Sequence, residues 1–263
     1  LTLHRARTSH RPSERAVALD APALAGSRVT PNMWQDAVIG PNPDGWGYFL
    51  RGKLNDSIEL FDGRGTLAQA IVTQIRKHDV YAEVQKLTKQ PPRQTRRLIL
   101  ATAVAKGQRF DWMLTKTTEL GIDHIALVQF DHSVRLGRES AIERYQSLTI
   151  AACKQCGRLY LPQITGPARL IEVIAELKKQ YPQSRLLYGG LEGKPTSLAE
   201  LSAWDGDTIV FVGPEGGMTE LEHRLLEHHG ATALRIGQHI LRTETAATAF
   251  SALLEALRVN NPA

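Results

Sequence analysis

The sequence predicts an α/β protein in which a small β-rich domain precedes a larger domain built on a parallel sheet with helices on both faces. Residues 208–212 read Thr-Ile-Val-Phe-Val, a continuous β-branched and aromatic run typical of a strand buried on both faces. Similar apolar runs alternate with amphipathic segments from Arg97 onward, which is the order of a βαβ fold. The region before residue 90 holds short strand-like segments and no long helical one. We therefore place the domains at residues 1–90 and 91–263, divided at Pro91-Pro92.

Short strand-like segments characterise the N-terminal domain. They lie at residues 48–50, 57–61, 68–73 and 80–84. The turn Asp62-Gly-Arg-Gly65 separates two of them and predicts a hairpin. Residues 41–47 are rich in Pro, Asn, Asp and Gly and predict a loop. This pattern is typical of a small barrel or a twisted sheet.

The C-terminal domain alternates strands and helices. We expect strands at residues 98–104, 124–130, 185–188 and 208–212, and helices at residues 110–120, 139–155, 170–179 and 245–259. In the first of these helices Phe110, Met113 and Leu114 share one face at helical spacing. Thr219 and Glu222 have the spacing of a capping box, which predicts a further helix soon after the strand at 208–212.

The chain is organised around the turn Gly213-Pro-Glu-Gly-Gly217, which we call the glycine turn. It joins a strand to a helix at the carboxyl end of the strand, and ligands of open α/β sheets bind in that crevice. Its glycines allow a ligand to approach the backbone closely. A plain tight turn is the alternative, but a second unusual string, Ile236 to Ala246, enters the last helix and favours a built pocket.

Composition limits the class of protein. The chain has 263 residues, of which 42% are hydrophobic and 22% charged, as expected of a soluble globular protein with one large or two modest domains. The net charge of +5 favours a polyanionic partner. No apolar run approaches the ~20 residues of a membrane span. Arginines at positions 5, 7, 11 and 15 make the start basic, which fits an organelle-targeting segment or, alternatively, a basic first strand or an RNA-contacting arm.

Cys153 and Cys156 are the only cysteines. Their spacing fits a redox pair or half of a zinc site, but no second cysteine pair or histidine spacing completes such a site. In a helix, positions three apart share a face in any case. We therefore expect reduced, structural cysteines in a cytoplasmic protein that holds no metal.

Four strings of the C-terminal domain occur together in a fixed order. They are Lys106-Gly-Gln-Arg-Phe-Asp-Trp-Met-Leu-Thr-Lys116 with Glu119-Leu-Gly121, Ala152-x-x-Gln-Cys-Gly-Arg158, the glycine turn, and Ile240-Leu-Arg-Thr-Glu-Thr-Ala246. In this order, over roughly residues 97–250, they resemble the ribosomal RNA small-subunit methyltransferase E family of the SPOUT superfamily. Leu50-Arg51 and Phe61-Asp-Gly63 resemble its N-terminal PUA-like barrel. The chain departs from the family at residues 41–47, which look inserted, and at Asn55-Asp56, where Gly-Asp is usual.

The resemblance implies a specific reaction and assembly. It implies a SPOUT domain with a deep trefoil knot, S-adenosylmethionine as cofactor, and a homodimer whose active sites use both subunits. The reaction it implies is methylation of uridine N3 in the 16S rRNA of the small ribosomal subunit. It also implies a cofactor pocket lined by three loops, with Tyr188, Gly189, Gly213, Glu215, Gly217, Ile236, Gly237, Ile240 and Leu241. For Glu215 the alternative role is to cap its own turn.

Uridine N3 must lose a proton before it can accept a methyl group. Its pKa lies about two units above neutral, so deprotonation costs ~3 kcal/mol. An arginine near O2 or O4 of the base can stabilise the developing anion, and a methyl sulfonium needs no metal. Our candidates are Arg242 and Arg158, with Glu244 orienting an arginine or accepting the proton. The alternative for Arg242 and Glu244 is a structural ion pair at the start of the last helix.

Basic residues near strand ends are candidates for contact with RNA phosphates. They are Arg51, Lys106, Arg109, Lys116 and Arg135, each of which has a solvated surface charge as its alternative. Trp112 is expected in the core or in a dimer interface. Two other functions remain open: a SPOUT methyltransferase of another RNA site, such as a ribose 2′-hydroxyl or a tRNA base, and an inactive RNA-binding assembly factor. The string that begins at Lys106 argues against another RNA site. The intact glycine turn and the intact string from Ile240 to Ala246 argue against an inactive assembly factor.

Overall fold

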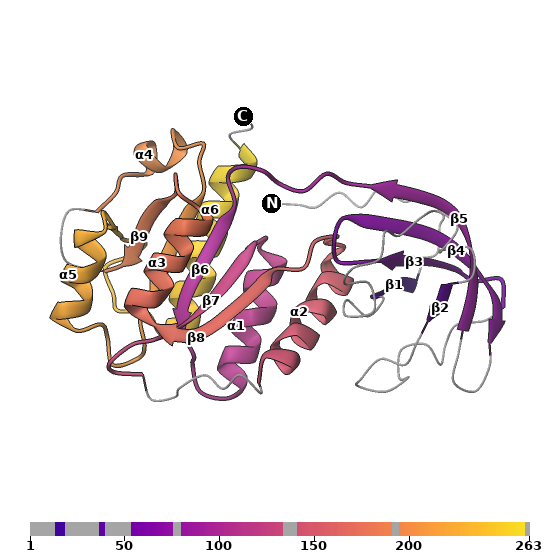
Figure 1. The fold of residues 1–263 in the computed structure, drawn as a ribbon, viewed down its shortest axis with the longest axis horizontal. Helices are drawn as coiled ribbons and strands as arrows, with labels where there is room; N and C mark the ends of the chain where they lie inside the picture. The colour runs from indigo at the N-terminus through magenta and orange to yellow at the C-terminus, as the bar shows by residue number, and fades with distance from the viewer. Residues whose placement is uncertain are drawn as a thin grey trace. The chain divides into compact units, whose positions relative to one another are not determined.

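A computed structural model describes residues 14–18, 37–39, 54–75, 80–133, 141–190 and 195–260 of the chain (Figure 1). The chain divides into two compact units, Leu1–Pro92 and Arg93–Ala263. The division falls directly after the Pro91-Pro92 pair. Each unit is described by itself.

The described strands of the first unit pair in the order β1-β3-β4-β5-β2. They are β1 (Glu14–Ala18), β2 (Ala37–Ile39), β3 (Ser57–Phe61), β4 (Thr66–Ile75) and β5 (Val80–Lys89). β3, β4 and β5 are antiparallel to one another, whereas β1 runs parallel to β3. Alternate residues of β3 and β4 are buried, as a sheet with one covered face requires. The predicted strand at 48–50 and loop at 41–47 lie outside the described residues.

The predicted hairpin between β3 and β4 is confirmed. Its turn is closed by Asp62, whose Oδ1 accepts hydrogen bonds from the amides of Arg64 at 2.7 Å and Thr66 at 2.9 Å. β4 and β5 are longer than predicted. Residues 85–89 are exposed, and most of them are polar, but the backbone continues to pair with β4 as far as Thr66↔Lys89. Ladder hydrogen bonds, which side-chain polarity does not reveal, extend the strand here.

The described strands of the second unit form one parallel sheet in the order β11-β9-β10-β6-β7-β8. They are β6 (Leu98–Ala103), β7 (His124–Gln129), β8 (Gln163–Arg169), β9 (Arg185–Gly189), β10 (Thr208–Val212) and β11 (Thr232–Leu234). β6, β7, β9 and β10 confirm the four predicted strands. β8 and β11 were not predicted, because β8 contains Gly166 and Pro167 and β11 is three residues long. Both are edge strands, where such sequences are tolerated.

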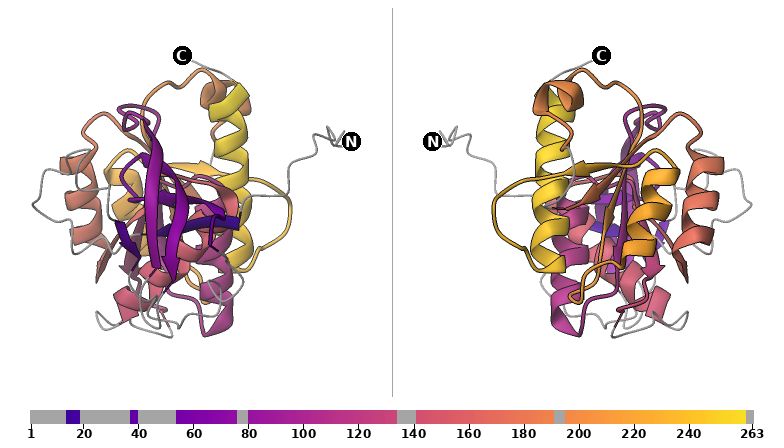
Figure 2. Two further views of the ribbon diagram at one scale, coloured as in Figure 1. Left: turned by 90° about the vertical axis from the view of Figure 1, so that its right-hand side faces the viewer. Right: turned by 90° about the vertical axis from the view of Figure 1, so that its left-hand side faces the viewer.

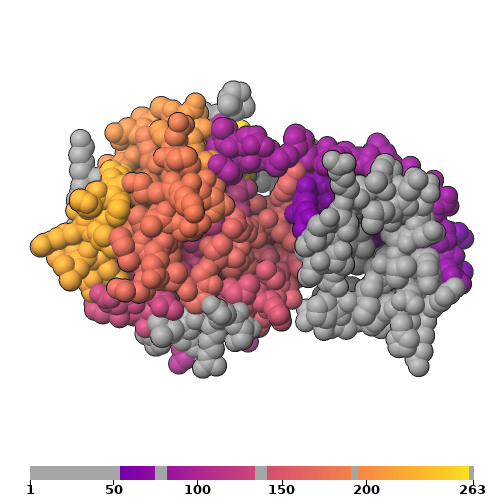
Figure 3. Space-filling model, in the orientation of Figure 1, coloured from indigo at the N-terminus to yellow at the C-terminus, as the bar shows by residue number. Residues whose placement is uncertain are grey.

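Helices cover both faces of this sheet, as predicted. They are α1 (Gln108–Glu119), α2 (Ile142–Cys156), α3 (Leu170–Gln180), α4 (Leu198–Ser202), α5 (Glu220–His228) and α6 (Thr243–Asn260). Leu98 and Leu100 of β6 pack with α1, α2, α4 and α6, whereas Ile99 and Ala101 pack with α3 and α5. Figure 2 shows α6 on one side of the sheet and α3 and α5 on the other. Figure 3 shows part of the surface that α3 and α5 form. The short helix α4 was not predicted.

Candidate active site

The carboxyl ends of β9, β10 and β11 lie side by side, because these strands are neighbours and parallel. The chain therefore leaves all three strands at the same side of the sheet, the edge formed by their carboxyl ends, through residues 189–190, 213–219 and 235–242. They correspond to the three loops that the family resemblance implies for the cofactor pocket. α6 begins at the same edge, since Thr243 Oγ1 donates a hydrogen bond to the carbonyl of Gly213 at 3.0 Å. This contact joins the glycine turn to the start of the last helix.

Close packing against α6 requires a glycine at position 189. A Cβ atom on Gly189 would lie 2.8 Å from Cε2 of Phe250 in α6, closer than Cβ atoms come to other atoms. Gly189 therefore lets α6 pack against the end of β9. Its neighbour Tyr188 was predicted to line the pocket, but its side chain is buried under α5. The Tyr188 hydroxyl donates to Oε1 of Glu227 at 2.8 Å, so only the backbone of Tyr188 can face the site.

Apolar side chains are exposed on the segment that leads into α6. Ile240 is 89% exposed, and Ile236 and Leu241 are 41% and 37% exposed. Three large apolar side chains within six residues indicate a surface that a ligand or a partner covers. Glu215 is also exposed, and among the described residues its carboxylate makes no hydrogen bond or ion pair. The alternative that Glu215 caps its own turn is therefore not observed.

Arg242 and Glu244 stand at the start of α6 but do not pair. Arg242 is exposed, and its guanidinium has no partner among the described residues, although its carbonyl accepts the amide of Ala246 at 2.8 Å. Glu244 is only 8% exposed, and its Oε2 has no hydrogen-bond donor in the described part of the chain. The structural ion pair that the sequence left open is thus absent there. A buried carboxylate oxygen without a donor is costly, which marks Glu244 as a residue that the fold alone does not explain.

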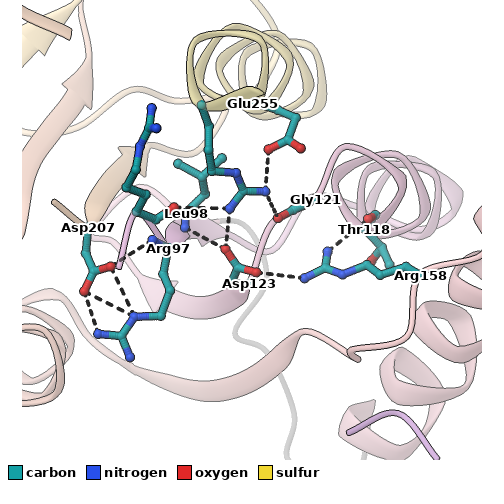
Figure 4. A network of polar contacts seen from close by, with 10 residues as sticks. Arg97, Leu98, Thr118, Gly121, Asp123, Arg158, Asp207 and Glu255 are labelled. Carbon is teal, nitrogen blue, oxygen red and sulfur yellow. Dashed lines mark hydrogen bonds and ion pairs between the residues drawn. The ribbon is translucent and has the colours of Figure 1, made fainter. Parts of the chain in front are cut away.

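Arg158 lies at the other end of the strands, where their amino ends meet, and its predicted catalytic role is not supported. Its guanidinium donates to the carbonyl of Thr118 and to Oδ1 of Asp123, both at 3.1 Å (Figure 4). Asp123 directly precedes β7, so it marks the amino ends of the strands. α2 starts beyond the carboxyl end of β7 and returns to the amino end, which carries Arg158 away from the glycine turn. Burial lowers the pKa of the Arg158 guanidinium, and the charge of Asp123 opposes this effect.

A polar network surrounds Asp123. Its Oδ2 accepts from the amide of Leu98 at 2.9 Å and from Nη1 of Arg258 at 2.7 Å. Arg258 also pairs with Glu255 and donates to the carbonyl of Gly121 at 2.9 Å (Figure 4). The network thus joins the end of α6 to the starts of β6 and β7.

Two of the basic residues predicted to contact RNA lie at the edge that holds the glycine turn. Lys106 and Arg109 are exposed where the chain leaves β6, the neighbour of β10, and enters α1. Lys116 lies two turns further along α1, and its Nζ is bound to both carboxylate oxygens of Glu119 at 2.9 Å. Arg51 and Arg135 lie outside the described residues. Trp112 is 48% exposed on α1, so its prediction as a core residue is wrong.

Comparison with known proteins identifies the family. A family model described as an RNA methyltransferase domain matches residues 92–255. The ribosomal RNA small subunit methyltransferase E of Rickettsia conorii is 31% identical over 207 residues, which cover 75% of this chain and 80% of that protein. The chain belongs to the ribosomal RNA small subunit methyltransferase E family.

Solved structures of this kind share the fold. The family member from Neisseria gonorrhoeae, bound to S-adenosyl methionine, has a TM-score of 0.79 and 27% identity, and the match covers 92% of this chain and 97% of that one. A putative methyltransferase from Legionella pneumophila in complex with the same cofactor has a TM-score of 0.73 and 25% identity, over 88% and 94% of the two chains.

Other features of the described residues lie away from this edge. A cleft of about 510 Å³ opens at the amino ends of β9 and β11, beside Lys178, Arg185 and Trp204. Within the described ranges, no three His, Cys, Asp or Glu side chains come together as a metal site would require. In the same ranges, no helix has the length and apolar character needed to span a bilayer. Cys153 is buried, which raises the pKa of its thiol to about 12, and Cys156 is exposed.

Proposed function

We propose that this protein transfers a methyl group from S-adenosylmethionine to N3 of a uridine in the 16S rRNA of the small ribosomal subunit. The observation that carries the proposal is the convergence of three loops and the start of α6 at one edge of a parallel sheet. Membership of the family and its resemblance to a cofactor-bound relative support the choice of cofactor. The names of the relatives support ribosomal RNA of the small subunit as the substrate.

The residues at this edge fit the cofactor. S-adenosylmethionine has a flat adenine, and the exposed apolar side chains of Ile236, Ile240 and Leu241 can cover it. The backbone of the glycine turn and of Gly189 and Gly237 can bind its polar groups, together with the carboxylate of Glu215. When bound, the cofactor supplies a methyl group on a sulfonium.

Arg242 and Glu244 provide the proton chemistry in this proposal. The guanidinium of Arg242, which has no partner among the described residues, stabilises negative charge on O2 or O4 of the uracil as N3 loses its proton. Stabilisation of this kind offsets most of the ~3 kcal/mol needed for deprotonation. Glu244, in the first turn of α6, orients an arginine or accepts the proton.

We further propose the assembly that the sequence resemblance implies. The second unit is a SPOUT domain with a trefoil knot, the first is a PUA-like domain that binds RNA, and the protein acts as a homodimer in the cytoplasm. Lys106 and Arg109 contact RNA phosphates, since they are exposed beside the glycine turn. Trp112, at 48% exposure, contributes to the dimer interface.

The deciding experiment is methyl transfer from labelled S-adenosylmethionine to small subunits that lack the modification, followed by nucleoside analysis. We expect 3-methyluridine. Arg242→Ala should lower kcat about a hundredfold while cofactor binding stays within about twofold, because roughly 3 kcal/mol of anion stabilisation is lost. Arg224→Ala is the matched control, since Arg224 is an exposed arginine of α5 paired with Glu220.

Three outcomes would revise the proposal. A ribose-methylated product would retain the family and replace the target atom. No product despite clear cofactor binding would favour an assembly factor or another RNA substrate. Equal activity of Arg242→Ala and Arg224→Ala would remove Arg242 from the mechanism.

A further inference from the structure

The loop that leaves β7 makes direct contact with the glycine turn, which no sequence motif indicated. His132 places its Nδ1 3.1 Å from the carbonyl oxygen of Gly216 and 3.2 Å from that of Gly217. β6 lies between β7 and β10 in the sheet, so this contact connects two loops whose strands are not neighbours. We propose that His132 is a positioning residue that holds the Gly216–Gly217 end of the glycine turn in the conformation that binds the cofactor. This inference rests on the proposed cofactor site.

The chemistry of the contact determines the state of the imidazole. Carbonyl oxygens only accept hydrogen bonds, so Nδ1 of His132 must carry a hydrogen. The neutral ring is therefore the Nδ1–H tautomer, and protonation at Nε2 leaves this donor in place. One donor thus holds two successive peptide groups of a turn that contains three glycines.

Close packing against His132 requires a glycine at position 216. A Cβ atom on Gly216 would lie 2.9 Å from Cβ of His132, so no other residue allows the two loops to approach as closely. Glycine backbones have more conformational freedom than others, which makes an external tether more useful here. Gly217, with φ of 77°, has a conformation that other residues rarely adopt.

Further hydrogen bonds hold the same loop against the start of α5. The amide of Asp131 donates to Oε1 of Glu222 at 2.8 Å. The other carboxylate oxygen of Glu222 accepts from the amide of Thr219 at 2.7 Å and caps the helix. Ser133 closes the loop on β7, because its Oγ accepts the amide of Phe130 at 3.0 Å. Hydrogen bonds therefore hold the residues on both sides of His132, Asp131 and Ser133, in place. The side chain of His132 extends from this ordered segment and can hold the glycine turn in a defined conformation.

Three variants separate positioning by the Nδ1 donor from other roles. His132→Ala removes the donor. His132→Asn restores an N–H at the same number of bonds from the backbone as Nδ1, whereas His132→Gln places it one bond further, near the position of Nε2. His228→Ala is the matched control, since His228 is an exposed histidine at the other end of α5.

The measurement is the Kd for S-adenosylmethionine by calorimetric titration, with kcat and KM from the methyl-transfer assay. We expect His132→Ala and His132→Gln to raise the Kd roughly tenfold, the effect of losing one well-placed hydrogen bond. His132→Asn should stay within about threefold of wild type and His228→Ala within about twofold. The loss should appear in KM for the cofactor, with kcat at saturation within about twofold and Tm unchanged, because His132 is exposed.

The two proposals fail in different ways. If wild type binds the cofactor but His132→Ala binds it equally well, or if His132→Asn is as weak as His132→Ala, the inference on His132 is wrong and the proposed function stands. If wild type binds no S-adenosylmethionine, both are wrong.

Discussion

Stability of the second unit should fall as the pH falls from 7 to 5, because His124 is buried without a charge. His124 is 1% exposed, with Nδ1 3.0 Å from the Tyr181 hydroxyl and Nε2 2.7 Å from Oγ1 of Thr165. Burial lowers its pKa from 6.5 to about 4. Below pH 6.5 the unfolded chain therefore binds a proton that the folded chain does not, and the free energy of unfolding decreases until the pH passes about 4.

The size of this effect follows from the two pKa values. Each unit corresponds to 1.36 kcal/mol, so His124 removes about 2 kcal/mol of stability at pH 5 and about 3 kcal/mol below pH 4. The assay is urea unfolding at pH 7, 6 and 5 for wild type and His124→Gln, which retains an amide near Thr165 but cannot titrate. We expect the variant to be less stable at pH 7 and to lose about 2 kcal/mol less than wild type between pH 7 and 5. Parallel losses in the two proteins would refute the reasoning.

Three further predictions concern packing and reactivity. Asp123→Ala should lower the free energy of unfolding by about 3 kcal/mol, since it leaves the buried Arg258 and the partly buried Arg158 without their shared carboxylate; a loss below about 1 kcal/mol in urea unfolding would contradict this. Gly189→Val should destabilise by about 1–3 kcal/mol and lower Tm through overpacking against Phe250, and an unchanged Tm would show that α6 moves freely. At pH 8, iodoacetamide should label Cys156 and spare Cys153 in the native protein, because burial raises the pKa of the Cys153 thiol to about 12; equal labelling by mass spectrometry would contradict this.

Local patterns were sufficient for the interior of the fold. Apolar runs predicted β6, β7, β9 and β10. Strands that are buried on both faces carry apolar residues at nearly every position, so their sequences differ clearly from the alternating apolar and polar pattern of surface strands. The edge strand β8 escaped prediction, since its Gly166-Pro167 pair is compatible with an edge position and is typical of a turn elsewhere. The outer parts of β4 and β5 were not predicted either, because they are strands only through backbone pairing with each other, which their side chains do not reveal.

Candidate site residues divide in the same way. The sequence predicted that the glycine turn and the start of α6 contribute to one site, because glycines after a strand and a helix start are local signals. The hydrogen bond from Thr243 to Gly213 confirms that the two segments are in contact, and their role in binding stays a prediction. Arg158 was a catalytic candidate because of its motif alone, and the motif says nothing about the end of the sheet that α2 reaches; in the structure its partners are Thr118 and Asp123. His132 was missed, because it contacts a residue 84 positions away across an intervening strand.

The sequence by itself determined the family, the alternation of strands and helices, and the turn at which a cofactor is expected, since each depends on residues close together in the chain. The tertiary structure alone decided which residues share the edge with that turn. It brought Gly213 to Thr243 and His132 to Gly216, and it placed Arg158 with Asp123 at the other end of the strands. The physical reason is that parallel strands collect loops from distant parts of the chain at one edge, and the strand order that decides the neighbours is set by packing of the whole sheet.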